Sequence, residues 1–135
     1  MILTDAGPLI ALLDRGDPDH ASCVRALDLV SLPLVTTWPA FTEAMYLLGA
    51  STGYAGQAAL WELMHSGRLE IVELTSESVD AAAASMKKYA DRPMDLADAT
   101  LVAAAEQLGE SRVFSIDSDF RFYRRMGGKA FTVIP

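Results

Sequence analysis

Short apolar segments with a strand-like pattern alternate with segments of helical periodicity along almost the whole 135-residue chain. The stretch Leu69–Leu74 interleaves apolar and acidic side chains, as does a strand with one wetter face. By contrast, apolar residues stand at every third position of Ala21–Val30, which is the spacing of one helix face. Strands separated by helices pair in parallel, because each connection must cross over the sheet. The chain is therefore expected to adopt an α/β fold, a three-layer α/β/α sandwich with a mainly parallel sheet.

Glycine, proline and capping residues divide the chain into its expected elements. Strands are predicted over residues 1–5, 33–37, 69–74, 112–116 and 131–134. Helices are predicted over about 8–13, 18–30, 39–48, 55–65, 75–89 and 96–108, with a short one around Phe120 and Tyr123. The stretch 49–56 is expected to be a break between two helices, since glycine stands at both ends. No repeat or linker interrupts the series, so residues 1–135 are expected to form a single domain.

The composition limits the cellular locations that suit the protein and the ways in which it can bind a polyanion. The single cysteine, Cys23, excludes an internal disulfide and a cysteine-based metal site, which suits a reducing, cytoplasmic location. The N-terminus has no basic segment and no apolar run is long enough for a membrane span, so no membrane association is expected. The net charge is −7, whereas proteins that bind nucleic acid by neutralising phosphates are usually basic. Any contact with a polyanion must therefore be local and assisted by a cation.

Four acidic residues occupy related places relative to the predicted strands. Asp5 and Asp117 follow the first and fourth strands directly. Glu43 lies one turn into the helix after the second strand, and Asp98 lies in the first turn of the helix over 96–108. Each acid has an ordinary explanation, such as a turn, a solvated helix face or a helix cap. Together, however, they should meet at the carboxyl edge of a parallel sheet, where ligands of such folds bind.

Carboxylates that converge in a poorly solvated cleft repel one another unless a cation compensates their charge. A ligand set made only of oxygens, without histidine or cysteine, favours hard ions, so Mg²⁺ or Mn²⁺ is expected. A divalent ion held by carboxylates, which activates water and steadies a phosphate, is the usual device for hydrolysing a phosphodiester.

Four segments resemble the motifs of the PIN-domain ribonucleases and occur in the order of that family. They are Leu3–Leu13, Thr42–Leu48, Leu96–Ala105 and Phe114–Phe120. The resemblance is closest to the VapC-type toxins of bacterial toxin–antitoxin systems. It spans nearly the whole chain. Two departures are visible: Ala6-Gly7 stands where many members carry a hydroxyl pair, and the fourth motif is shorter than its commoner form.

The resemblance implies an endoribonuclease that cuts structured RNA with Mg²⁺ or Mn²⁺ held by Asp5, Glu43, Asp98 and Asp117. It also implies a cognate antitoxin as partner and a homodimer. Ser115 matches the hydroxyl residue that members often place beside the fourth acid. Two acids compete for these roles and remain secondary candidates. Asp117 is preferred to Asp119 because it follows the strand directly, and Asp98 is preferred to Asp95 because it stands in the matching Asp-Ala step.

Other residues carry weaker indications. The one basic cluster contains Arg121, Arg124, Arg125 and Lys129; its arginines are candidates for contacts with the RNA backbone, although a solvated face is the default interpretation. His20 and His65 are expected to have surface or capping roles. The aromatic residues Trp38, Phe41 and Tyr46 are expected in the core or in an interface rather than as base-stacking platforms. Some apolar residues between 39 and 65 could be surplus to the core and form a subunit contact or a groove for a partner helix.

Two alternatives belong to a different functional class. A phospho-receiver-like module also gathers acids at strand ends and binds Mg²⁺, but it needs an acid ending the central strand and a lysine after the last strand. Here the third strand ends in Glu73-Leu74 and no lysine follows the fifth. A catalytically silent PIN-like interaction module is the second alternative. The presence of all four acids argues against it.

Overall fold

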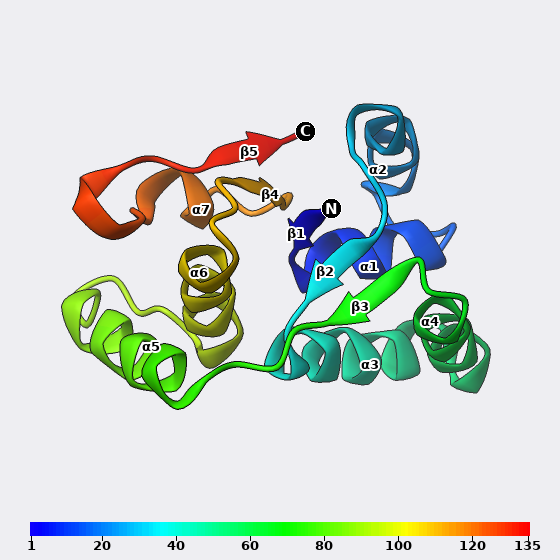
Figure 1. Ribbon diagram of the computed structural model, residues 1–135. Helices are drawn as coiled ribbons and strands as arrows, with labels where there is room; N and C mark the ends of the chain where they lie inside the picture. The colour runs from blue at the N-terminus through cyan, green and yellow to red at the C-terminus, as the bar shows by residue number, and fades with distance from the viewer.

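The computed structural model describes all residues from 1 to 135, which form a five-stranded sheet and seven α-helices (Figure 1). The strands are β1 (Ile2–Thr4), β2 (Leu34–Thr36), β3 (Leu69–Ile71), β4 (Arg112–Phe114) and β5 (Thr132–Ile134). The helices are α1 (Ala6–Leu13), α2 (His20–Ala26), α3 (Trp38–Thr52), α4 (Tyr54–His65), α5 (Ser76–Lys88), α6 (Leu96–Leu108) and α7 (Asp119–Phe122). Two 3-10 turns complete the set, at Leu27–Leu29 and Met126–Gly128. No helix has both the length and the apolar character to cross a bilayer.

The strands lie in the order β3-β2-β1-β4-β5 and every neighbouring pair is parallel. The expectation of a mainly parallel sheet is confirmed, and the sheet is parallel throughout. The order reverses at β1, which pairs with β2 on one side and β4 on the other. Folds of this kind bind ligands where the strand order reverses. The receiver-like alternative is wrong, because receiver modules have the strand order 2-1-3-4-5.

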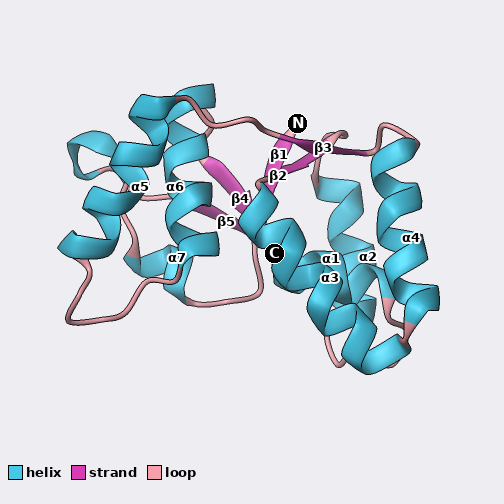
Figure 2. Cartoon of the chain, turned by 90° about the horizontal axis from the view of Figure 1, so that it is seen from below, coloured by secondary structure: helices cyan, strands magenta, loops and turns pink.

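The two faces of the sheet bury separate apolar clusters, which confirms the three-layer sandwich. Because neighbouring strand residues point to opposite faces, Ile2 packs with α1–α4 while Leu3 packs with α5–α7. Val113 and Phe114 divide in the same way between the α6 side and the α1 side. Figure 2 shows the two groups of helices on either side of the strands.

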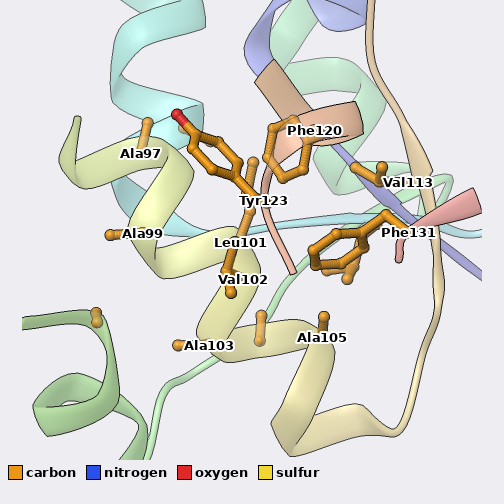
Figure 3. Packing of buried hydrophobic residues seen from close by; sticks show 14 of the residues in the cluster. Ala97, Ala99, Leu101, Val102, Ala103, Ala105, Val113, Phe120, Tyr123 and Phe131 are labelled. Atoms are coloured by element: carbon orange, nitrogen blue, oxygen red, sulfur yellow. The ribbon is translucent and has the colours of Figure 1, made fainter. Parts of the chain in front are cut away.

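Helix α6 is buried along most of its length, since every residue from Ala97 to Ala105 is shielded from solvent. Its many alanines let the helix approach β1 and α5 closely, and the rings of Phe120, Tyr123 and Phe131 fill the space beside it (Figure 3). A helix that joins two parallel strands runs antiparallel to them, so its first turn lies at the carboxyl edge of the sheet. The packing of α6 therefore holds Asp98 at that edge.

Several predicted boundaries are wrong. Strand β4 stops at Phe114 instead of residue 116, so Asp117 does not follow the strand directly and two residues separate them. The helix break does not cover 49–56: α3 continues to Thr52, and only Gly53, with φ of 71°, interrupts the helical backbone. A Cβ on Gly56 would clash with Thr52 Oγ1, so that glycine allows α3 and α4 to pack closely rather than ending a helix. Strand β3 stops at Ile71 instead of residue 74, because its partner β2 ends at Thr36. Helix α2 ends at Ala26, and the chain then tightens into a 3-10 turn.

Candidate active site

One open cavity of about 570 Å³ lies at the carboxyl edge of the sheet, beside the switch point between β1 and β4. Five acidic side chains line it and no basic side chain does. They come from the end of β1, from α3, from the start of α6 and from the segment after β4: Asp5, Glu43, Asp95, Asp98 and Asp117. The structure thus brings the four acids singled out in the sequence to one place, together with the secondary candidate Asp95.

Asp5 is almost wholly buried and both of its carboxylate oxygens are engaged. Its Oδ1 accepts a hydrogen bond of 2.8 Å from the Ala6 amide, so the side chain caps α1. Its Oδ2 accepts a hydrogen bond of 3.0 Å from Ser115 Oγ. The Ser115 hydroxyl also accepts a hydrogen bond of 3.1 Å from the Asp117 amide. Ser115 therefore ties together the loops that carry Asp5 and Asp117.

Asp98 is held from two sides at the start of α6. The Asp95 side chain caps the helix, and its Oδ1 accepts a 2.8 Å hydrogen bond from the Asp98 amide. The hydroxyl of Tyr123 donates a 2.9 Å hydrogen bond to Asp98 Oδ2. Figure 3 shows the Tyr123 hydroxyl directed toward the end of α6 that carries Ala97. Sequence reasoning missed Tyr123, because no short-range spacing relates it to Asp98.

The two acids after β4 have different surroundings. Asp117 lines the cavity, and its Oδ1 accepts a 3.0 Å hydrogen bond from the Asp119 amide. Asp119 does not line the cavity; its Oδ1 forms a salt bridge of 3.1 Å with Arg92 Nη2. The geometry therefore favours Asp117 over Asp119 as the fourth acid of the cavity.

Burial and mutual repulsion make three acids of the cavity, Asp5, Glu43 and Asp98, reluctant to ionise. Burial, and then the charges of Asp95 and Asp5, raise the pKa of Asp98 to about 7, although the hydrogen bond from Tyr123 opposes the rise. Burial also raises the pKa of Asp5 above its usual range, against its hydrogen bonds from Ala6 and Ser115. Glu43 is only partly buried; its pKa is likewise raised, first by burial and then by Asp95 and Asp5.

Such a cavity suits a hard divalent cation, since it offers only oxygen ligands whose negative charges no protein cation compensates. No three histidine, cysteine or acidic side chains form a compact coordinating group in their present conformations. The carboxylates surround a common space instead of converging on one point.

The arginines singled out in the sequence have three different environments. Arg124 Nη1 donates hydrogen bonds to the carbonyl oxygens of Arg121, Phe122 and Tyr123 at the end of α7. Arg125 Nε donates to the carbonyl of Ala130. Arg121 lines a smaller polar cavity of about 270 Å³, whose wall it shares with Asp117. Among the three, only Arg121 lies beside the acids.

The histidines and the aromatic residues lie outside the cavity. His20 Nδ1 contacts the Ala11 carbonyl at 2.6 Å and joins α2 to α1, while the His65 ring stacks on Trp61. Phe41 is buried, as predicted for a core residue. The core interpretation is wrong for Trp38 and Tyr46, which are 44% and 74% exposed.

Comparison with known proteins agrees with this geometry. The family model described as "PIN domain" matches residues 2–126. The chain is 28% identical over 135 residues to the protein named Ribonuclease VapC26 of Mycobacterium tuberculosis, with 99% of this chain and 100% of that protein covered.

Two solved structures share the fold. The first is Mycobacterium tuberculosis VapC20, described as a sarcin-ricin loop cleaving toxin, with a TM-score of 0.86, 21% identity and 100% of both chains covered. The second is a toxin-antitoxin complex from Klebsiella pneumoniae, with a TM-score of 0.65, 20% identity and coverage of 87% of this chain and 88% of the other. The resemblance noted in the four sequence motifs is confirmed.

Proposed function

The chain belongs to the PIN-domain family, and from this premise we propose that it is a divalent-metal-dependent endoribonuclease, the toxin of a toxin–antitoxin pair. The observation that carries the proposal is the cavity at the sheet switch point, which five carboxylates and no basic side chain line. The similarity to a protein named as a ribonuclease supports the chemistry. The shared fold with toxins, one of them in a complex with its antitoxin, supports the biological role.

Asp5, Glu43, Asp98 and Asp117 would hold Mg²⁺ or Mn²⁺, with Asp95 beside them. When bound, the ion supplies charge stabilisation for the phosphate and lowers the pKa of a water molecule. The protein's own part is to keep the carboxylates in place: Ser115 holds Asp5, and Tyr123 holds Asp98. Glu43 makes no hydrogen bond to another side chain of the protein, so the carboxylate oxygen that does not bind the metal ion would be available to orient the attacking water and accept its proton.

RNA is the proposed substrate. A phosphodiester at the acids would place the backbone of its flanking nucleotide near Arg121, because the smaller cavity that Arg121 lines shares Asp117 with the acidic cavity. Contacts between arginine and phosphate position a strand without reading its sequence. Arg124 and Arg125 are expected to contribute less, because backbone carbonyls already engage their guanidinium groups.

An antitoxin and a second copy of the chain are the proposed protein partners. The acidic cavity suits an arginine supplied by the antitoxin, which could satisfy the same carboxylates as the metal ion and so block the site. Co-expression with the neighbouring gene tests the first partner, and light scattering on the free protein tests the homodimer. A monomer at micromolar concentration would count against the dimer.

Cleavage of RNA by the purified protein tests the proposal. We expect cleavage with Mg²⁺ or Mn²⁺ and none in EDTA. Binding of Mn²⁺ without any cleavage of RNA would favour the catalytically silent alternative. Cleavage in EDTA would place the chemistry outside the acidic cavity.

A further inference from the structure

A second hollow, of about 700 Å³, opens directly from the acidic cavity. It lies between the first half of α3 and the first turn of α6, and it shares two wall residues, Glu43 and Asp95, with the acidic cavity. Trp38, Tyr46 and Leu96 line it and are respectively 44%, 74% and 54% exposed. We call this hollow the aromatic groove. Its walls are mainly apolar away from the two acids.

The aromatic side chains of the groove differ in how firmly they are held. Trp38 is fixed, because its Nε1 donates a 3.0 Å hydrogen bond to Glu73 and its ring packs edge-on against Phe41. Tyr46 has no such restraint and presents most of its ring to solvent. The fixed ring of Trp38, next to the apolar Leu96, forms a surface on which a flat ring can stack at little entropic cost, and the free ring of Tyr46 can turn to cover the other face of that ring.

We propose that the aromatic groove binds the nucleobase next to the scissile phosphate of the RNA substrate, with Tyr46 and Trp38 as its stacking partners. The inference rests on the proposed function, because it assumes that the phosphodiester lies at the acids. Two hollows adjoin the acidic cavity, the aromatic groove and the smaller cavity beside Arg121, and a nucleotide bonded to that phosphate has room in either. The hollow beside Arg121 is polar and suits the backbone, whereas the aromatic groove is apolar and suits a base.

This assignment defines the class of substrate. A base inside a helix stays paired and stacked on its neighbours, whereas an unpaired base can turn outward onto an aromatic side chain. The groove therefore selects RNA in which the nucleotide beside the scissile bond is unpaired, as in a loop, a bulge or a single strand. Because every base has a flat face, stacking alone tolerates all four bases, so the groove selects for lack of pairing more than for sequence.

The test uses a pool of RNA hairpins with randomised loops, cleaved by the protein with Mn²⁺ and sequenced to locate the cut. The best-cleaved hairpin is then made again with an abasic ribose on either side of the scissile bond. We expect the wild-type protein to lose about tenfold in kcat/KM when one of the two flanking bases is missing, in line with the loss of one stacked base. The kcat/KM of Tyr46→Ala on the intact hairpin should also be about tenfold below that of the wild type. On the hairpin that lacks the stacked base, Tyr46→Ala and the wild type should have nearly the same kcat/KM.

Tyr54→Ala is the matched control, because Tyr54 is also 74% exposed but does not line the groove. It should cleave every hairpin as the wild type does. If the losses in kcat/KM caused by Tyr46→Ala and by the abasic ribose multiplied when the two were combined, the side chain and the base would act independently and the inference would be overturned. So would unchanged cleavage by Tyr46→Ala, and a loss of self-association in the same variant would then assign the groove to a protein partner. If the wild-type protein cleaves no hairpin, the proposed function itself has failed.

Discussion

The hydroxyl of Tyr123 donates a 2.9 Å hydrogen bond to Oδ2 of Asp98, across a separation of 25 residues in the chain. Tyr123 is fully buried, and its ring packs against Phe120 and Tyr89. The bond favours the charged form of Asp98, whereas burial and the neighbouring acids favour the neutral form. Tyr123 is therefore a positioning residue, which keeps one carboxylate oxygen of Asp98 in place and eases its ionisation.

Tyr123→Phe should weaken Mn²⁺ binding about tenfold at pH 7 while leaving the fold intact. The variant keeps the buried ring but loses the bond that favours ionised Asp98, so less of this carboxyl is charged near pH 7. At pH 8.5 the difference from the wild type should shrink, because Asp98 is then mostly ionised in both proteins. Calorimetric titration with Mn²⁺ at the two pH values measures this.

Tyr89→Phe supplies the control for that experiment. Tyr89 belongs to the same aromatic cluster, but its hydroxyl accepts a hydrogen bond from the Arg124 amide and contacts no acid of the cavity. It should bind Mn²⁺ as the wild type does. Equal losses in the two variants would mean that Tyr123 acts only by supporting the core.

Asp5→Asn should abolish cleavage of RNA without unfolding the protein. The substitution removes one charge from a group of repelling acids, so the melting temperature in EDTA should hold or rise. Gel assays of RNA cleavage and thermal denaturation are the two measurements. Cleavage that persists in both EDTA and the variant would show that the acidic cavity does not perform the reaction.

Asp117→Asn and Asp119→Asn should distinguish the roles of the two acids that follow β4. Asp117 lines the cavity, whereas Asp119 is paired with Arg92. We expect Asp117→Asn to lose Mn²⁺ affinity and cleavage. Asp119→Asn should keep both and lose under about 1 kcal/mol of stability, because the Arg92 pair is partly exposed. The opposite pattern would move the fourth carboxylate to Asp119.

Without metal, the stability of the protein should fall as the pH rises from about 4 to above 7. The pKa of Asp98 is about 7 in the folded protein and 3.8 in its ordinary state. The folded state therefore binds this proton more tightly, and the stability it contributes is lost as Asp98 ionises. Thermal denaturation in EDTA across this pH range should show a smaller fall in melting temperature for Asp98→Asn than for the wild type.

Adding Mn²⁺ at pH 7.5 should restore stability to the wild type, since the ion binds the ionised carboxylates. A wild-type melting profile identical to that of Asp98→Asn would contradict the assignment.

Arg124→Ala should reduce the stability of the protein, whereas Arg121→Ala should reduce its affinity for RNA. Arg124 satisfies three backbone carbonyls at the end of α7, so its loss should lower the melting temperature by about 2–4 °C. Arg121 makes one long bond, of 3.4 Å, to the Pro135 carbonyl and borders the acidic cavity. Loss of Arg121 should leave stability unchanged and weaken RNA binding. Fluorescence anisotropy of a labelled RNA hairpin measures the affinity, with both arginine substitutions made in the Asp5→Asn protein so that the RNA is not cleaved. If RNA affinity fell equally in both variants, the basic cluster would act as a whole.

The order of strands and helices and the placement of acids after strands followed from the sequence. Periodicity, capping and turn residues are local properties, and they determine which segments become strands and where each strand ends. The alternation of elements then requires a parallel sheet, and a parallel sheet brings its carboxyl ends together. For this reason the amino-acid pattern alone predicts Asp5 and Asp117 at one edge of the sheet, where both line the cavity.

What the sequence left open depended on contacts between distant segments. The structure favours Asp117 over Asp119 because Asp119 pairs with Arg92 and does not line the cavity. The role of Tyr123 required the packing of α7 against α6, and the exposure of Tyr46 depended on how α3 is rotated against the sheet. Neither rotation nor packing is a local property, since each results from the fit of side chains far apart in the chain. The sequence by itself determined the fold class and the edge where the acids gather, whereas tertiary packing decided which side chains face the cavity.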